Sequence, residues 1–295
     1  MMRTAIGRPM MSSKAGYKLT QRDLKVVGLV EDYHLLTTSQ IQKLLYPSMQ
    51  KAQTRLYRIW RSGLVKRFPY PVLLREGGRG EYIYHIKRKP KMSMTGVLHT
   101  IELNDIRIAF DVACRESEHI EMIEFIPEYK GIVGSDGMMR RIVEDRVRIQ
   151  GGQKTEQRFI PDAAICLEKR ATRKRILLFI ELDLGSEKLV TRRAGSYSVV
   201  RKLEVYKEYL RQEGYKKHSD RFDHEFMGFR VLVIMSNQQR TQRLRKELTL
   251  KGIKKFVWFT QKSEITTETI LKEIWTMSDV NDEKKYSIIR GKEQK

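Results

Sequence analysis

The first third of the chain carries apolar residues at helical spacing. This spacing predicts a helix over residues 20–34, where Thr20 precedes the apolar positions and Asp23 follows three residues later as a weak capping box. A short second helix is predicted after Thr37 or Thr38 and ends at the Tyr46-Pro47 pair, because a residue before proline is disfavoured in a helix.

A third helix is predicted over residues 48–63, with Gly63 as its stop. Residues 64–68 and 81–86 then alternate between apolar and polar positions around a glycine-rich tip at 77–80, which predicts a two-stranded hairpin. Three helices followed by a hairpin form the element order of a winged helix-turn-helix.

The third helix has two chemically different sides. Ala52, Leu56 and Ile59 form an apolar stripe, and the opposite side carries Lys51, Arg55, Arg58 and Ser62. A basic helix face is often only solvated, but a basic hairpin follows here, and this order favours a helix in the major groove of DNA. The predicted DNA contacts are Lys51, Arg55, Arg58, Arg61, Lys66, Arg67 and, at the hairpin tip, Arg79.

Beyond residue 94, strands alternate with helices, which predicts a layered α/β domain whose inner strands are covered on both faces. The class of the whole chain is therefore α/β within an α+β arrangement. The predicted strands are 121–127, 139–149, 157–167, 175–183, 229–235 and 254–260, and the predicted helices are 96–117, 194–212, 238–250 and 267–277.

These patterns divide the chain into four segments. Residues 1–17 show no period and are predicted to form a flexible arm, followed by a winged-helix DNA-binding domain over 18–91. A basic stretch at 87–91 leads to the second domain, 94–280, and the polar residues 281–295 are predicted to be a disordered tail.

Charge changes this picture by indicating the partner. The net charge is +22 and the pI is about 9.9, and residues 1–92 hold nineteen Lys and Arg against five Asp and Glu, so they contribute +14. Such a surplus indicates a polyanionic partner, and nucleic acid is the one we expect.

No apolar run of about 18 residues is present, so we expect a soluble, cytoplasmic protein with no membrane partner. Two cysteines 52 positions apart do not make a zinc site.

Acidic residues mark two strands of the second domain. Asp162 follows Pro161 at the start of one strand region, and Glu181 and Asp183 close the next strand. A hard cation such as Mg²⁺ takes several oxygen ligands, and acids on adjacent strands supply them. Asp162, Glu181 and Asp183 are therefore the predicted metal ligands, with Mg²⁺ as the predicted cofactor.

This arrangement resembles the PD-(D/E)XK nuclease-like fold, a restriction-endonuclease-like mixed-sheet domain. More specifically, most of the chain resembles the plasmid replication-relaxation family. The resemblance implies action on plasmid or mobile-element DNA, in replication or in the relaxation of supercoiled DNA. The residues that carry it are the segment 36–41, Ser62 to Val65, Leu98-His99, Asn104-Asp105, Pro161-Asp162, Glu181 to Glu187, the helix at 202–206 and Ser236-Asn237.

Carried over residue by residue, the nuclease pattern makes Asp162 the first ligand and Glu181 the second. The third position, normally lysine, is Asp183, and a carboxylate supplies no positive charge to a developing phosphorane. Lys202 or Lys188 could replace that lysine, so the predicted catalytic set is Asp162, Glu181, Asp183 and Lys202. Alternatively, Asp183 and Glu187 join the metal shell, or the acids belong to an inactive scaffold and pair with Arg192, Arg193 or Arg201.

Three functions remain open at this point. The first is a DNA-binding protein of a plasmid or mobile element that acts in replication or relaxation, with a nuclease-like domain that does not cleave. The second is an active Mg²⁺-dependent endonuclease, and the third is a winged-helix transcription regulator whose second domain mediates self-association. Double-stranded DNA is the predicted partner, and a homodimer and other replication or relaxosome proteins are further candidates.

Overall fold

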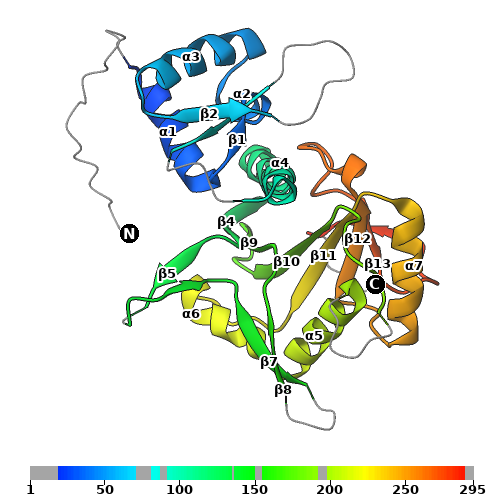
Figure 1. Ribbon diagram of the computed structural model, residues 1–295. Coiled ribbons are helices and arrows are strands. Elements are labelled where there is room, and N and C mark those ends of the chain that lie inside the picture. Colours follow the sequence, from blue (N-terminus) through cyan, green and yellow to red (C-terminus); the bar gives the residue numbers. More distant parts are fainter. Residues whose placement is uncertain are drawn as a thin grey trace. The chain divides into compact units, whose positions relative to one another are not determined.

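The computed structural model describes residues 19–70, 81–86, 92–134, 136–149, 155–191 and 198–289 (Figure 1). The predicted arm at 1–17, the hairpin tip with Arg79 and the basic stretch at 87–91 lie outside the described residues. The chain divides into two compact units, residues 1–108 and 109–295. Helices combined with a mixed seven-stranded sheet confirm the predicted α+β class.

The first unit holds the helices and strands predicted for it, in the predicted order. Its small sheet has the strand order β1-β3-β2, and both pairs are antiparallel. The elements are α1 (Gln21–Tyr33), β1 (Leu36–Thr37), α2 (Thr38–Leu45), α3 (Met49–Arg61), β2 (Lys66–Pro69) and β3 (Tyr82–His85), followed by the first part of α4 (Met94–Glu116).

Local sequence signals explain where these helices begin and end. Thr20 caps α1 in a capping box with Asp23, and Thr37 caps α2 in the same way with Gln40. Gly63 follows α3 with φ of +79°, a left-handed backbone conformation that glycine adopts without steric cost.

The unit boundary differs from the predicted start of the second domain at residue 94. It falls inside α4, at residue 108, because the first part of this helix packs in the first unit. Val97 and Ile101 share an apolar core with Leu35, and the Asn104 side-chain amide donates to the carbonyl of Tyr33 at 3.1 Å. Among the described residues no helix combines the length and the apolarity needed to cross a bilayer.

The second unit is built on a seven-stranded sheet with the order β14-β13-β12-β11-β10-β9-β4. The central pairs β10-β11 and β11-β12 are parallel, and the flanking pairs are antiparallel. The strands are β4 (Ile120–Pro127), β9 (Ala163–Lys169), β10 (Arg175–Asp183), β11 (Phe229–Met235), β12 (Val257–Gln261), β13 (Trp275–Met277) and β14 (Lys285–Tyr286).

Helices α5 (Val199–Arg211) and α7 (Gln238–Leu250) lie on the same side of this sheet (Figure 1). Their apolar residues share one core with the odd-numbered residues of β10, including Leu177 and Phe179. The crossovers through α5 and α7 join parallel strands, so the carboxyl ends of β10, β11 and β12 meet at one edge of the sheet. Short helical turns, η1 (Gly214–Lys217) and α6 (His218–Phe222), lie between α5 and β11.

Two predicted strands are each divided in the structure. Residues 139–149 form β6 (Met139–Arg141) and β7 (Asp145–Ile149), because Val143 turns into the core between them. Residues 157–167 form β8 (Thr155–Phe159) and β9, and the break falls at Pro161, which has no N–H to donate to a ladder.

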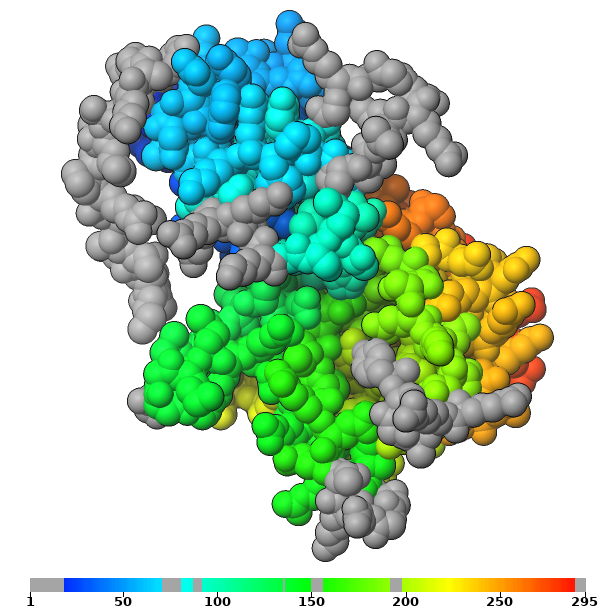
Figure 2. Space-filling view, viewed as in Figure 1, coloured from blue at the N-terminus to red at the C-terminus, as the bar shows by residue number. Residues whose placement is uncertain are grey.

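A hairpin of β5 (Gly131–Val133) and β6 projects from the second unit (Figures 1 and 2). The strand β5 was not predicted, because its glycine reads as a turn signal.

The helix predicted over residues 267–277 is wrong. This segment follows the short turn η2 (Lys262–Glu264) and continues into β13, which pairs with β12. Threonine side chains explain the failure, because the Thr269 hydroxyl bonds to the carbonyl of Glu264 and accepts from the Thr266 N–H at 3.0 Å. Such local bonds compete with the hydrogen bonds of a helix.

The disordered tail predicted over residues 281–295 is also wrong up to residue 289. Within it, β14 pairs with β13, and Ile288 is fully buried. The Arg230 guanidinium donates to the carbonyl of Ile288 at 3.0 Å, so this segment is held at the sheet edge.

Candidate functional site

The acids predicted as a site meet at the carboxyl end of β10. Asp162 precedes β9, and its backbone N–H donates to the carbonyl of Ile180 at 3.1 Å. Its carboxylate accepts from the N–H of Leu182 at 2.7 Å, which holds Asp162 beside Glu181. Ligands of open α/β sheets bind at this edge, so the position is one where chemistry is expected.

Glu181 is buried, with 8% of its surface exposed. The ammonium of Lys202, from α5, contacts one carboxyl oxygen, and the Tyr206 hydroxyl donates to the other. Burial raises the pKa of Glu181 to about 8, with Lys202 acting against this rise and Asp162 adding to it. The structure thus brings together Asp162, Glu181 and Lys202 from the predicted set.

In the nuclease pattern the third position is normally a lysine, and in this chain it is Asp183. Two other lysines were predicted as possible replacements for the missing positive charge. Lys188, just beyond β10, has an exposed side chain. Lys202 lies on α5, and only 11% of its side chain is exposed where it meets Glu181. A positive charge therefore reaches the acids from a helix rather than from the strand.

Asp183 has different partners from Glu181. One of its oxygens accepts from Arg240 Nε at 2.7 Å, and the other accepts from the N–H of Gly185 at 2.7 Å. The Arg240 guanidinium also donates to the carbonyl of Glu187. This arginine, on α7, holds the loop that follows β10.

The contacts of Glu181 and Asp183 bear on the predicted metal site. A hard cation needs several oxygen ligands, but Lys202 already engages Glu181 and Arg240 engages Asp183. Over the part of the chain that the structure describes, no group of three or more His, Cys, Asp or Glu side chains is placed to hold a metal ion. Lys202 and Arg240 thus contact carboxylate oxygens that the predicted Mg²⁺ site of Asp162, Glu181 and Asp183 would use.

The predicted DNA contacts of the first unit lie in different environments. Lys51, Arg58 and Arg61 on α3 and Lys66 on β2 have exposed side chains, and we call these four residues the basic face. Arg79 lies outside the described residues.

Arg55, predicted as an outward DNA contact, is paired within the first unit and does not belong to the basic face. Its guanidinium pairs with Asp23, whose side chain is 1% exposed, with Nε to Oδ1 at 3.0 Å. Burial alone would raise the pKa of Asp23, but hydrogen bonds from Arg55 and Thr20 outweigh it and hold that pKa below its usual value. Arg55 therefore joins α3 to α1.

Arg67 has a third kind of environment. Its guanidinium carbon lies 3.9 Å from the ring centroid of Trp60 and 3.9 Å from that of Tyr82. It is thus stacked between an aromatic residue of α3 and one of β3, which fixes the hairpin strands against the helix.

The family comparison covers both units. The sequence pattern that defines replication-relaxation proteins matches residues 27–224, which is about two thirds of the chain. The chain belongs to the replication-relaxation family. This membership supports a role in the replication of a plasmid or other mobile element.

The replication-relaxation match starts within α1 and ends before β11. It therefore includes the basic face, Asp162, Glu181 and Lys202, but not α7 with Arg240. A search of curated proteins and a search of solved structures each found no match.

Two contacts of this replication-relaxation protein were not anticipated from its sequence. Tyr206 is buried, and its hydroxyl donates to Glu181. Arg240 lies 57 residues beyond Asp183 and gave no signal in the local pattern. The Asn237 side chain accepts from the N–H of Arg240 at 2.9 Å, so an asparagine cap before α7 is the one feature that could have placed Arg240 at this sheet edge.

Proposed function

We propose that this protein binds double-stranded DNA of a plasmid or mobile element during replication, through the basic face of its first unit. The observation that carries the proposal is the exposure of Lys51, Arg58 and Arg61 on α3 and of Lys66 on β2. Family membership supports the replication role, and the charge of +14 over residues 1–92 supports a polyanionic partner.

The geometry of α3 suits a major groove. Ala52, Leu56 and Ile59 are buried on one side of the helix, so the cations at 51, 58 and 61 point the other way. Such a helix enters the groove with one face, and a neighbouring pair of strands reaches the phosphates. We assign these roles to α3 and to β2 and β3, the arrangement of a winged helix-turn-helix.

A direct test uses the full chain and a labelled duplex. We expect binding at low salt that weakens steeply as salt is raised, because phosphate contacts release counterions. Absence of binding at 50 mM salt would contradict the proposal. Binding with no salt dependence would also contradict it, because the contact would not be ionic.

For the second unit, we infer a nuclease-like scaffold that does not cleave DNA. Asp183 is held by Arg240, and Glu181 is held by Lys202 and Tyr206, so the acids already have partners of their own. These contacts hold α5 and α7 to the end of β10. The retained acids then serve the stability of the sheet edge rather than a reaction.

A metal-dependent endonuclease is the second candidate, and one observation favours it. Asp162 and Glu181 lie side by side with Lys202 in reach, which are the residue types of a phosphodiester-cleaving site. On this reading, binding of DNA would have to separate the ammonium of Lys202 from Glu181.

One assay separates the two candidates. Supercoiled and linear DNA are incubated with the protein, with and without Mg²⁺ or Mn²⁺, beside Asp162→Ala and, as a matched control, Glu118→Ala at an exposed acid. The scaffold predicts binding without nicking in all three proteins. Metal-dependent nicking that is lost only in Asp162→Ala would establish the endonuclease instead.

A further inference from the structure

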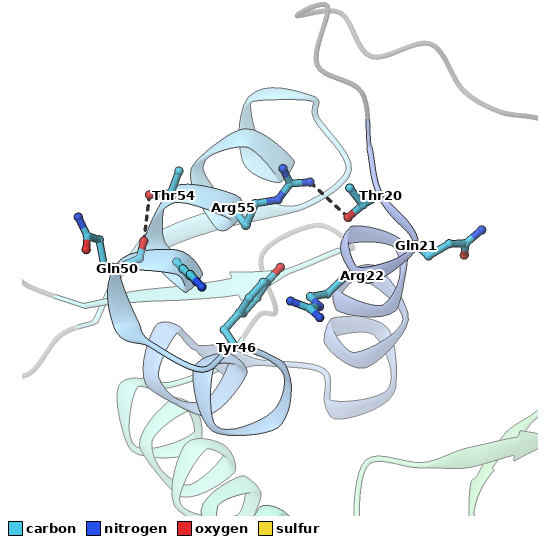
Figure 3. Close-up of a pocket in the computed structure, with 8 residues that line it drawn as sticks. Thr20, Gln21, Arg22, Tyr46, Gln50, Thr54 and Arg55 are labelled. Carbon is cyan, nitrogen blue, oxygen red and sulfur yellow. Dashed lines mark hydrogen bonds between the residues drawn. The ribbon is translucent and has the colours of Figure 1, made fainter.

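A cleft opens between the first turns of two helices in the first unit (Figure 3). It has a volume of about 590 Å³, and Thr20 and Arg22 of α1 line one side. Gln50 and Lys51, from the first turn of α3, line the other side, and Arg55 and Tyr46 also contribute. A volume of this size is typical of a site that takes a small molecule or part of a larger one.

The charge of the cleft is positive. Arg22, Lys51 and Arg55 line it, and among the described residues that line it there is no carboxylate. Asp23, beside the cleft residues Arg55 and Thr20, accepts hydrogen bonds from both through its carboxylate.

Both helices present their N-terminal ends here, since Thr20 caps α1 and Ser48 caps α3, and each helix has 13 residues. Helix N-termini favour negative ligands, so charge and helix direction agree.

An unpartnered hydroxyl gives a second, independent indication of a ligand. Tyr46 is 5% exposed, and its buried hydroxyl has no hydrogen-bond partner among the described residues. The ring projects between α1 and α3, with the hydroxyl directed between the two helices (Figure 3). Its pKa is raised to about 12 by burial and by Asp23, so the hydroxyl keeps its proton and can donate. A buried donor without an acceptor is costly, and an anionic oxygen would satisfy it.

We infer that this cleft is a phosphate-binding site in which the Tyr46 hydroxyl donates to the phosphate and Arg22 and Lys51 neutralise it. Arg22 is suited to this role because its guanidinium lies 6.0 Å from the Tyr46 ring centroid, at the same end of the cleft. A planar guanidinium binds a phosphate through two parallel hydrogen bonds.

Two sources could supply the phosphate, a DNA backbone or a free nucleotide. We assign it to a DNA backbone, and this part rests on the proposed function. Lys51 belongs both to the cleft and to the basic face, so a strand that follows α3 would pass the cleft. The site then positions the duplex without reading its sequence.

The first experiment measures binding of inorganic phosphate to the full chain at constant ionic strength, by titration calorimetry. The variants are Arg22→Gln and Tyr46→Phe, with Lys25→Gln as the matched control, because Lys25 is an exposed cation of α1 outside the cleft. We expect Arg22→Gln and Tyr46→Phe each to weaken phosphate binding about tenfold, and Lys25→Gln to leave it unchanged.

Tyr46→Phe has a second readout that a structural role would not give. Because the hydroxyl has no partner in the unliganded protein, its removal should leave the melting temperature without phosphate unchanged or raised. Phosphate should then stabilise the variant less than the wild type. A variant that melts lower and still binds phosphate like the wild type would overturn the inference.

The second experiment repeats the comparison with a short DNA duplex and with AMP. Weaker duplex binding in Arg22→Gln and Tyr46→Phe supports the backbone as the source. If the duplex binds but neither variant weakens it, and phosphate does not bind, the inference fails while the proposed function stands. If phosphate and AMP bind through Arg22 and Tyr46 but no duplex binds, the proposed function fails and the assignment to the DNA backbone fails with it.

Discussion

Glu181 shows how one buried residue links the end of β10 to α5. Its carboxyl group contacts Lys202 and Tyr206, which are one helical turn apart on the same helix. Both partners are separated from it by more than 20 residues; the nuclease pattern predicted Lys202 near the acids, whereas Tyr206 was not predicted to contact Glu181. The buried carboxyl group of Glu181 also makes the stability of the protein sensitive to pH.

The pH prediction concerns the proton on Glu181. Burial raises its pKa from 4.5 to about 8, so between these values the folded protein binds a proton that the unfolded chain releases. Stability therefore falls as pH rises from 5 to 8. The wild type should lose on the order of 2–4 kcal/mol over this range relative to Glu181→Gln.

Urea unfolding at several pH values checks this expectation, with the exposed Glu118→Gln as control. Parallel stability profiles for the wild type and Glu181→Gln would show that the Glu181 proton is not linked to folding.

Arg55 gives the second prediction at this scale. Arg55→Ala leaves the buried carboxylate of Asp23 without its cation, and we expect a loss of about 3 kcal/mol in the free energy of unfolding. In the double variant with Asp23→Ala the further loss should be small, because the two side chains are coupled. Denaturant unfolding of the four proteins in this cycle measures the coupling. If the losses in the free energy of unfolding of the two single variants add up to that of the double variant, Arg55 and Asp23 do not stabilise the fold by interacting with each other.

At the scale of elements, sequence patterns predict what depends on neighbouring residues. The helices α1 to α3 follow from their caps, their apolar spacing and Gly63, and β11 and α7 begin and end at the predicted residues. The failures come from contacts between distant segments or from local side-chain bonds. The segment 267–277 has a helical apolar pattern, but hydroxyl bonds of Thr266 and Thr269 and pairing with β12 prevail.

The candidate site follows the same rule. The placement of Asp162 beside Glu181 could be predicted, because adjacent strands carry them. The pairing of Arg55 inside the fold could not be predicted. Helical spacing shows which residues share a side of α3, but it does not show that Arg55 contacts Asp23, which lies 32 residues away in the sequence.

The prediction for the hairpin strands concerns Arg67. Arg67→Lys keeps the charge but loses the flat group that stacks between Trp60 and Tyr82. We expect the free energy of unfolding to fall by about 1 kcal/mol, since each cation–π contact contributes about 0.5–1 kcal/mol. The exposed Arg61→Lys, on α3, is the control for a change of cation at the surface. Equal effects of the two changes, measured by urea unfolding, would rule out a role for the stack.

At the scale of the whole molecule, the division within α4 differs from the boundary that composition indicates. The basic stretch at 87–91 is typical of a linker, yet Val97, Ile101 and Asn104 beyond it complete the core of the first unit. Charge and polarity along the chain therefore do not locate the end of a folding unit when a helix continues through it.

This division predicts how fragments behave. A fragment of residues 19–116 should fold, whereas 19–93 should be unfolded or should melt at a much lower temperature, because it lacks the α4 residues that pack on Leu35 and bond to Tyr33. Far-UV circular dichroism and thermal melting compare the two. Equal melting temperatures of the two fragments would mean that the first folding unit ends before residue 94, as the sequence predicted.

The central claim is that the basic face holds DNA through phosphate contacts, and the salt dependence of duplex binding tests it most directly. The full chain is compared with the variant Arg58→Ala, Arg61→Ala, beside Lys25→Gln as a control for charge on α1. Each lost contact lowers the slope of log K against log salt by about 0.9, so the account predicts a slope smaller by about two in the double variant and a smaller change in the control. An unchanged slope in the double variant, with binding retained, would contradict the account and place the DNA elsewhere on the protein.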